Sequence, residues 1–233
     1  MQKSQLISDA TGEPIFKFEN LPSDTAKQRV RDWYVQHWLF DDWAEFYIDD
    51  AKAKGRTMGF EIECIYYSGF WSQGDGASWV GDINLPLFLE KHLPESIGRD
   101  CWLWLFQSGW VHDKLAVYQG GSLYYHSGTM SIGNVGVYTD CEAALETKLD
   151  LNCILKGAPI QTLWDLIMSD TDCPIKGADD LEELALEKAR EYADDIYKRL
   201  EKGYEESTSD EEISYALDAN DIYFDEFGER SEL

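Results

Sequence analysis

The sequence predicts an α+β fold: an antiparallel or mixed β-sheet with N-terminal helices packed on it, followed by an acidic C-terminal helical segment. Apolar residues recur at helical spacing near the N-terminus, alternate with the period of a strand from residue 58, and return to helical spacing over residues 178–206. Apolar residues make up 44% of the 233 residues and aromatic residues 14%. A packed core is therefore expected, not a disordered chain.

Two amphipathic helices are expected before residue 58. Ser23 or Asp24 can cap the first, since a side-chain oxygen at this position accepts a backbone amide of the first turn. This helix should run to about His37. The second should begin near residues 41–42 and end at Gly55, because glycine suits the left-handed conformation that often follows a helix.

Strands are expected where the pattern changes. Phe60, Ile62 and Cys64 alternate with Glu61 and Glu63, as in a strand with one buried face, which predicts a strand over 58–67. Further strands are expected at 77–83, 101–107, 114–119 and 122–127. A short helix is expected over Leu85–His92, between two of these strands. Gly120 and Gly121 predict a hairpin turn between the last two strands, since glycine readily adopts positive φ.

Helices should close the chain. Shorter helices are predicted at 140–150 and 160–168, and another at 209–219. Between them, leucine, alanine and tyrosine form one stripe of a heavily charged segment, which predicts a long helix over 178–206. Ile222–Phe224 is expected to form an edge strand.

Negative charge is concentrated towards the C-terminus. The chain has 20 basic and 45 acidic residues and a net charge of −25, and residues 170–233 alone hold 22 acidic and 7 basic residues, a net charge of −15. We therefore expect three parts: a loose arm at 1–14, an α+β core domain at 15–169, and an acidic helical extension at 170–233 that packs on the core.

This charge favours some partners over others. A strongly negative surface repels phosphates and anionic membranes, so the sequence predicts no direct binding to nucleic acid or membranes, and a partner with a basic surface. The alternative is that the charge serves solubility alone. No apolar run approaches the roughly 20 residues of a membrane span, and no signal peptide is recognised, so a cytoplasmic location is expected. Homo-oligomer formation is left open.

The cysteines are not arranged as a redox or metal motif. The five residues form no CxxC pair, and they are expected to be free and mostly buried thiols. Their positions are Cys64, Cys101, Cys141, Cys153 and Cys173.

Several segments carry a resemblance to a known family. The most specific is Ile65–Trp79, which contains YSGFWSQGDGAS, and shorter matches lie at 18–24, 31–34, 42–43, 49–52, 125–130 and 217–228. Together they resemble a family of uncharacterised, phage-associated acidic proteins that are sometimes labelled antitoxin-like. The resemblance implies phage origin, a location in the host-cell cytoplasm and one integrated fold. It supplies no activity, and it does not cover 170–206.

The loop in this motif is the first candidate site. Its glycines allow close backbone approach, its amides could hold an anion or a base edge, and its aromatic rings could stack on a flat ligand. In the alternative interpretation the loop is a tight connection whose aromatics cap the core and whose Asp75 bonds its own backbone. The candidate ligand-binding residues are Tyr67, Ser68, Phe70, Trp71, Ser72, Gln73, Asp75, Ser78 and His126.

No catalytic or metal site is predicted. His112, Asp113 and His126 match no metal-ligand spacing, and an ordinary hydrogen-bonded role is favoured for these histidines over acid–base chemistry. Asp75 and Asp82 are a carboxylate pair of the kind that chance produces in so acidic a chain. The sequence also lacks a GxSxG nucleophile motif and an EF-hand loop. We therefore expect no cofactor and no enzymatic activity.

The acidic tail is the second candidate site. Its carboxylates could line one face and imitate nucleic acid towards a basic groove, or they could form a solvated surface that keeps the chain soluble. The candidate partner-binding residues are Asp179, Asp180, Glu183, Glu187, Glu191, Asp194, Asp195, Glu205, Glu206, Asp210 and Glu211.

The function expected from these features is that of a phage-encoded, non-enzymatic accessory protein. It would bind and inhibit a host factor, for example a defence nuclease or a DNA-binding complex, by acidic mimicry of nucleic acid. Two alternatives remain open: a protein that binds a small molecule or nucleotide signal at residues 68–78, and an antitoxin-like protein.

Overall fold

A computed structural model describes residues 6–7, 12–39, 41–92, 114–120, 125–133 and 178–231. The chain divides into two compact units. Unit 1 combines residues 1–47 with residues 199–233, and unit 2 comprises residues 48–198. The domain boundary expected near residue 169, the strand expected at 101–107 and the helices expected at 140–150 and 160–168 lie outside the described residues.

Unit 2 contains a four-stranded antiparallel sheet, so the α+β prediction is confirmed. The strand order is β3-β4-β5-β6. The register between the first two strands shifts between Ile62 and Cys64, which marks a bulge in the first strand. The strands are β3 (Phe60–Tyr67), β4 (Ala77–Asn84), β5 (Lys114–Gln119) and β6 (Met130–Ile132).

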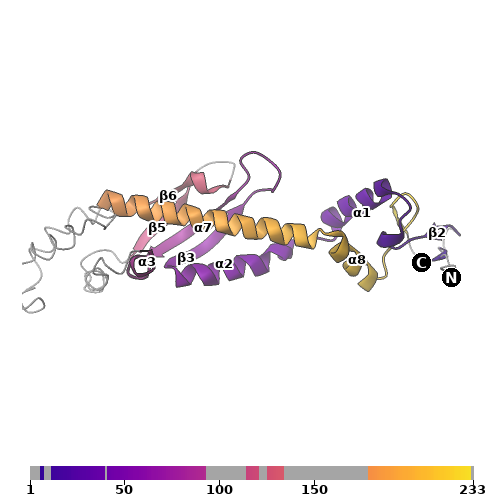
Figure 1. Cartoon of the computed structure of the whole chain (residues 1–233), viewed down its shortest axis with the longest axis horizontal. Coiled ribbons are helices and arrows are strands. Elements are labelled where there is room, and N and C mark those ends of the chain that lie inside the picture. Colours follow the sequence, from indigo (N-terminus) through magenta and orange to yellow (C-terminus); the bar gives the residue numbers. More distant parts are fainter. Residues whose placement is uncertain are drawn as a thin grey trace, which may run out of the picture. The chain divides into compact units, whose positions relative to one another are not determined.

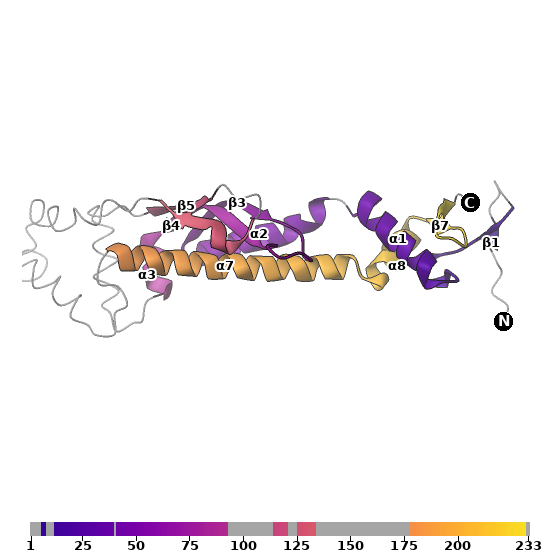
Figure 2. The ribbon, with the colours of Figure 1, turned by 90° about the horizontal axis from the view of Figure 1, so that it is seen from above.

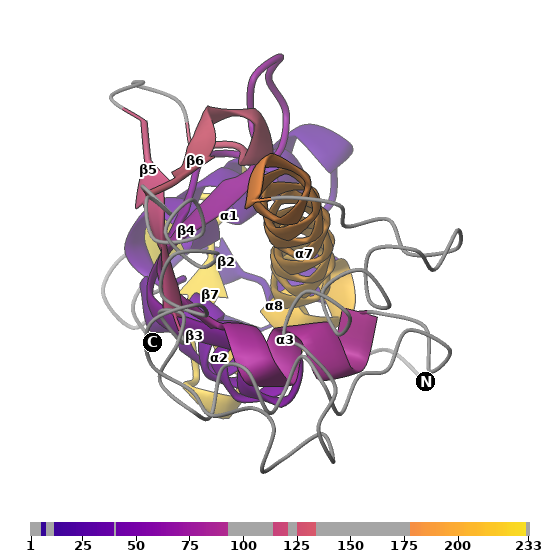
Figure 3. The same ribbon diagram turned by 90° about the vertical axis from the view of Figure 1, so that its left-hand side faces the viewer.

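Three helices cover one face of this sheet, as the end-on view in Figure 3 shows. They are α2 (Glu45–Thr57), α3 (Leu85–His92) and α7 (Ala178–Ser207). Within unit 2, α7 runs alongside the strands (Figure 2). The Trp79 indole N–H on β4 donates to the backbone carbonyl of Ala189 on α7 at 3.1 Å. Tyr192 on the same helix stacks on Phe60 of β3, with ring centroids 5.3 Å apart.

The core of unit 2 lies between the sheet and these helices. Trp79, Ile83 and Phe88 are fully buried, and so is Ala189 on the striped face of α7. Burying one such large side chain contributes about 1.5–3 kcal/mol, so this layer supplies much of the driving force for folding. The opposite face of the sheet is polar at one end, where the Lys114 ammonium contacts Glu61 at 2.5 Å and Asp82 at 3.5 Å.

Unit 1 is built from both ends of the chain. Helix α1 (Asp24–His37) lies against α8 (Asp210–Ala219), as Figure 1 shows, and Val30 and Leu217 are buried in their shared apolar cluster. Phe16 and Phe224 exchange backbone hydrogen bonds of 2.7 and 2.9 Å. The other elements of this unit are β1 (Leu6–Ile7), β2 (Pro14–Ile15), η1 (Phe18–Asn20), η2 (Asp41–Ala44), β7 (Tyr223–Phe224) and β8 (Arg230–Ser231).

Serine side chains cap two helices. Ser23 accepts a hydrogen bond from the Ala26 amide at 3.1 Å, which confirms the predicted start of α1. Ser209 accepts one from the Glu212 amide at 3.2 Å at the start of α8. Each cap satisfies a backbone N–H that the helix leaves unpaired, and its loss typically costs about 1 kcal/mol.

Two expected boundaries were wrong. Helix α2 continues past Gly55 to Thr57, and Gly55 instead allows close packing, because a β-carbon there would lie 3.1 Å from Ile62 and 3.2 Å from Tyr192. The strand expected at 122–127 does not extend over residues 125–127. Residues 127–129 form a 3-10 turn, stabilised by a 2.7 Å hydrogen bond from the Thr129 hydroxyl to the His126 carbonyl, and the paired strand begins at Met130.

Candidate functional site

The loop between β3 and β4 is held by its own side chains. One carboxylate oxygen of Asp75 accepts hydrogen bonds from the backbone amides of Trp71, at 2.8 Å, and Ser72, at 2.5 Å. At the base of the loop, the Ser68 hydroxyl accepts from the Gly76 amide at 3.2 Å, and the Ser68 amide donates to the Gly76 carbonyl at 3.0 Å. The amides of Trp71 and Ser72 are therefore already occupied by an anionic group of the chain itself.

Neighbouring aromatic residues of this loop point in opposite directions. Phe70 is buried and packs on Tyr197 of α7, with ring centroids 5.6 Å apart. The Tyr197 hydroxyl donates to the Gly69 carbonyl at 3.1 Å. Trp71, the next residue, is 76% exposed. The loop therefore presents an indole ring to solvent from a connection anchored on α7.

Most of the loop candidates lie close together in the structure, but they differ in how far they are exposed. Tyr67 and Ser68 are half-buried at the base, and Ser72 and Gln73 are exposed at the tip. Ser78 is fully buried within β4. His126 lies over Gly76. A β-carbon added to Gly76 would lie 2.6 Å from the β-carbon of His126. The residues His112 and Asp113 lie outside the described part of the chain.

Exposed carboxylates follow one another along α7 in unit 2. We call Glu183, Glu187, Glu191 and Asp194 the acidic row, because each is exposed and they are spaced four, four and three residues apart. Glu191 forms an ion pair with Lys188 at 2.7 Å. The other three form no ion pair with another described residue. The three carboxylates without an ion pair give the row a net negative charge on the helix surface.

The remaining acidic candidates differ in their surroundings. Asp195 is half-buried and lies 3.6 Å from the Lys54 ammonium. In unit 1, Asp210 pairs with Arg31, and Glu206 lies 3.4 Å from Lys202. The side chains of Asp179 and Asp180 lie outside what the structure describes, although both residues belong to α7.

Unit 1 carries a hollow with acidic walls. It has a volume of about 670 Å³, and we call it the acidic hollow. Its lining combines four glutamates with a cap serine and Tyr215, which is 71% exposed. The residues are Glu205, Glu206, Ser209, Glu211, Glu212 and Tyr215. A cation entering this hollow would meet several carboxylates and the side chain of Tyr215.

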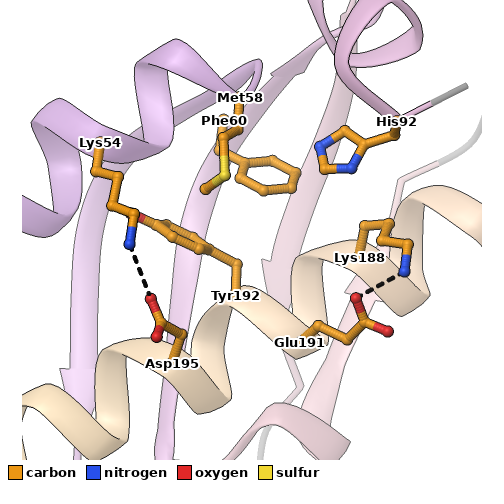
Figure 4. Close-up of a pocket in the computed structure, with 8 residues that line it drawn as sticks. All are labelled: Lys54, Met58, Phe60, His92, Lys188, Glu191, Tyr192 and Asp195. Carbon is orange, nitrogen blue, oxygen red and sulfur yellow. Dashed lines mark hydrogen bonds and ion pairs between the residues drawn. The ribbon is translucent and has the colours of Figure 1, made fainter.

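A second hollow lies in unit 2 among α2, β3, α3 and α7 (Figure 4). It has a volume of about 280 Å³, and the rings of Phe60 and Tyr192 line it. The two lysines around it, Lys54 and Lys188, each face a carboxylate of α7, so the ion pairs balance the charge of this hollow.

His92 lines the same hollow and packs on Phe88, with ring centroids 4.5 Å apart. Burial lowers the pKa of His92, and the Lys188 ammonium lowers it further, while a hydrogen bond to the Met58 backbone and the Glu191 carboxylate act in the opposite direction. The neutral imidazole is therefore favoured. Its Nε2 atom is buried without a hydrogen-bond partner, so this residue belongs to the packing and offers no accessible base.

The described part of the chain contains no cluster suited to a metal ion. No three His, Cys, Asp or Glu side chains there are close enough to share one. Cys64 is a half-exposed free thiol, and the other four cysteines lie outside the described residues. Among the described helices, none is both long enough and apolar enough to cross a bilayer.

Comparison with known proteins covers the centre of the chain. Residues 43–97 match the model of a domain of unknown function (DUF8835). The matched segment contains α2, β3, β4 and α3, and with them the loop that carries Trp71. No curated protein and no solved structure matches the chain.

Two features of these surfaces were not anticipated from the sequence. Tyr215 was not among the candidates, although its place beside a run of acidic residues was a signal that could have been used. The hollow beside His92 had no such signal, because its residues come from four separated elements.

Proposed function

We propose that the protein is a non-enzymatic binding protein whose partner carries a basic surface. The observation that carries this proposal is the acidic row, in which Glu183, Glu187 and Asp194 are exposed and form no ion pair with another described residue. Uncompensated surface charge contributes little to folding, but it attracts an oppositely charged partner and speeds association. The acidic hollow in unit 1 offers a second surface of the same sign.

The spacing of the acidic row favours attraction by charge over close imitation of a DNA duplex. Four residues of helix rise about 6 Å, whereas one strand of B-DNA carries a charge about every 3.4 Å along the axis. A single row therefore has roughly half the linear charge density of one strand. Mimicry of nucleic acid would need carboxylates from more than one element.

The phage association implied by the YSGFWSQGDGAS segment gives this proposal a biological setting. A phage-encoded acidic protein that binds a basic host protein would block that protein's own nucleic-acid surface. A defence nuclease or DNA-binding complex is the class of host factor that fits this chemistry. The proposed role is therefore that of an inhibitor acting in the host-cell cytoplasm.

The test is a pull-down from bacterial host lysate with the tagged full chain. Retention should be compared at about 0.1 M and about 1 M salt, because the Debye length falls from about 10 Å to about 3 Å over this range. A basic host protein should be retained at low salt and released at high salt. The row variant Glu183→Gln/Glu187→Gln/Asp194→Asn should lose at least tenfold in affinity for that protein, measured afterwards with the purified partner by calorimetry.

A matched control separates a specific surface from general charge. Glu19→Gln/Asp49→Asn/Glu63→Gln removes three exposed acidic residues elsewhere and changes the net charge equally. This variant should retain the partner. The proposal fails if no basic protein is retained at low salt, or if the row variant and the control lose binding equally.

The two alternatives predict different results. A nucleotide-signal protein would change its tryptophan fluorescence on titration with nucleotides, and Trp71→Phe would reduce that change. Because Asp75 already occupies two loop amides, such a ligand would have to use other groups of the loop. An antitoxin-like protein would rescue growth when co-expressed with its toxin.

A further inference from the structure

Trp71 has an unusual combination of exposure and restraint. Its side chain is 76% exposed, so it adds little to the core of unit 2. Single exposed apolar residues are common on proteins and need no explanation by themselves. What distinguishes Trp71 is the set of contacts that fixes its backbone.

The restraint acts on both sides of the indole. Asp75 accepts hydrogen bonds from the amides of Trp71 and Ser72, and its own amide donates to the Ser72 carbonyl at 3.1 Å. Before the indole, Phe70 is buried against Tyr197. Because the backbone around Trp71 is already held in place, binding through this residue needs little further ordering of the loop, which favours affinity.

The neighbouring charge indicates what the indole would meet. Tyr197, which holds the loop, is three residues from Asp194 at the end of the acidic row, a rise of about 4.5 Å along α7. The face of an indole is the best aromatic partner for a cation, and arginine is the cation most often found there. Tryptophan and arginine are also the residue types most enriched at the energetic centres of protein interfaces.

We propose that Trp71 is a binding anchor that stacks on an arginine side chain of the partner, while the adjacent acidic row attracts the partner's other basic groups. This inference rests on the proposed function for the nature of the partner. It adds a residue and an interaction that charge alone does not require. The carboxylates would provide salt-sensitive attraction, and the indole would provide a contact that persists when salt screens them.

A deca-arginine peptide is the probe for this proposal. Its dissociation constant from the full chain is measured by fluorescence anisotropy at low and high salt. Trp71→Leu keeps an apolar side chain but removes the ring, and it should weaken binding about fivefold, the change that corresponds to an exposed cation–π contact of about 1 kcal/mol. The affinity of Trp71→Phe for the peptide should lie between that of the wild type and that of Trp71→Leu. Phe46→Leu, which changes a 75% exposed aromatic residue in unit 1, should have no effect.

A second readout observes the indole directly. The Nε1–H resonance of Trp71, assigned by its absence in Trp71→Phe, should shift on titration with the peptide. The inference is overturned if Trp71→Leu binds deca-arginine as tightly as the wild type, or if that resonance does not move. If the row variant binds the peptide as tightly as the wild type, the proposed function fails instead. Unchanged melting temperatures would confirm that these variants remain folded.

Discussion

The guanidinium of Arg31 donates two hydrogen bonds to the carboxylate of Asp210, from Nε to Oδ1 at 2.6 Å and from Nη2 to Oδ2 at 2.8 Å. The two residues are 179 positions apart in the sequence and belong to α1 and α8. Two charge-assisted hydrogen bonds in this paired geometry are stronger, and more specific in orientation, than neutral hydrogen bonds. It joins the beginning and the end of the chain at the surface of unit 1.

Breaking this pair should cost modest stability and alter its pH dependence. Both side chains are partly exposed, so Arg31→Met should lower the free energy of unfolding by about 0.5–1 kcal/mol. The hydrogen bond from Arg31 lowers the pKa of Asp210 below its ordinary value of 3.8. The stabilisation is therefore present above pH 3.8 and is lost as the pH falls through the lowered pKa. Urea unfolding of the wild type, the two single variants and the double variant Arg31→Met/Asp210→Asn, at pH values above and below 3.8, would measure this stabilisation.

Removing the Asp75 carboxylate should loosen the loop that carries Trp71. Asp75→Ala leaves two backbone amides without their acceptor and should destabilise the protein by about 1–2 kcal/mol. The local effect should be larger than the global one, with faster hydrogen exchange at Trp71 and Ser72. Asp194→Ala, which removes an exposed carboxylate from α7, is the control and should stay within about 0.5 kcal/mol of wild type. Unchanged exchange at both amides would contradict the role given to Asp75.

Gly59 should tolerate no side chain. Its φ is +91°, and a β-carbon there would lie 2.7 Å from the backbone nitrogen of Phe88. Gly59→Ala therefore combines backbone strain with a clash against α3, and we expect a loss of more than about 2 kcal/mol in thermal or urea unfolding. Gly12 has a φ of +71° with open space around it, so Gly12→Ala carries the strain without the clash. Equal losses in the two variants would show that the contact with Phe88 is unimportant.

His92 should make the stability of unit 2 depend on pH. Its lowered pKa means that the unfolded chain takes up a proton first, so stability is complete above about pH 6.5 and falls as the pH drops below that value. His92→Phe preserves the packing on Phe60 and Phe88 without a titrating group. The advantage of wild type over this variant should shrink, or reverse, between pH 7.5 and pH 5. A constant difference across that range would rule out the proposed effect of burial.

Local patterns predicted the elements well. Ser23 marks the start of α1, and the alternation from Phe60 onwards marks β3, because helix capping and the alternation of side chains along a strand involve residues close in sequence. The apolar stripe with Ala185, Tyr192 and Ile196 predicted α7, and all three are buried. The predicted end of α2 was wrong because Gly55 packs against side chains that are distant in sequence, and no local pattern reveals such a contact.

The surfaces were harder to predict than the elements. The acidic residues of the row could be found from composition, but their exposure and pairing depend on which face of α7 meets the sheet. The division of the loop into a buried Phe70 and an exposed Trp71 depends on Tyr197, more than one hundred positions away. Contacts of this kind are set by long-range packing, which a single sequence does not encode in a readable form.

The interleaved path of the chain through unit 1 has a practical consequence for dissecting the protein. Trimming the chain at either end would strand half of an apolar cluster in water, so the usual strategy of nested deletions would yield insoluble or unfolded fragments. An excised unit 1 should instead keep residues 12–47 and 199–231 together, with a short designed connector in place of everything between them.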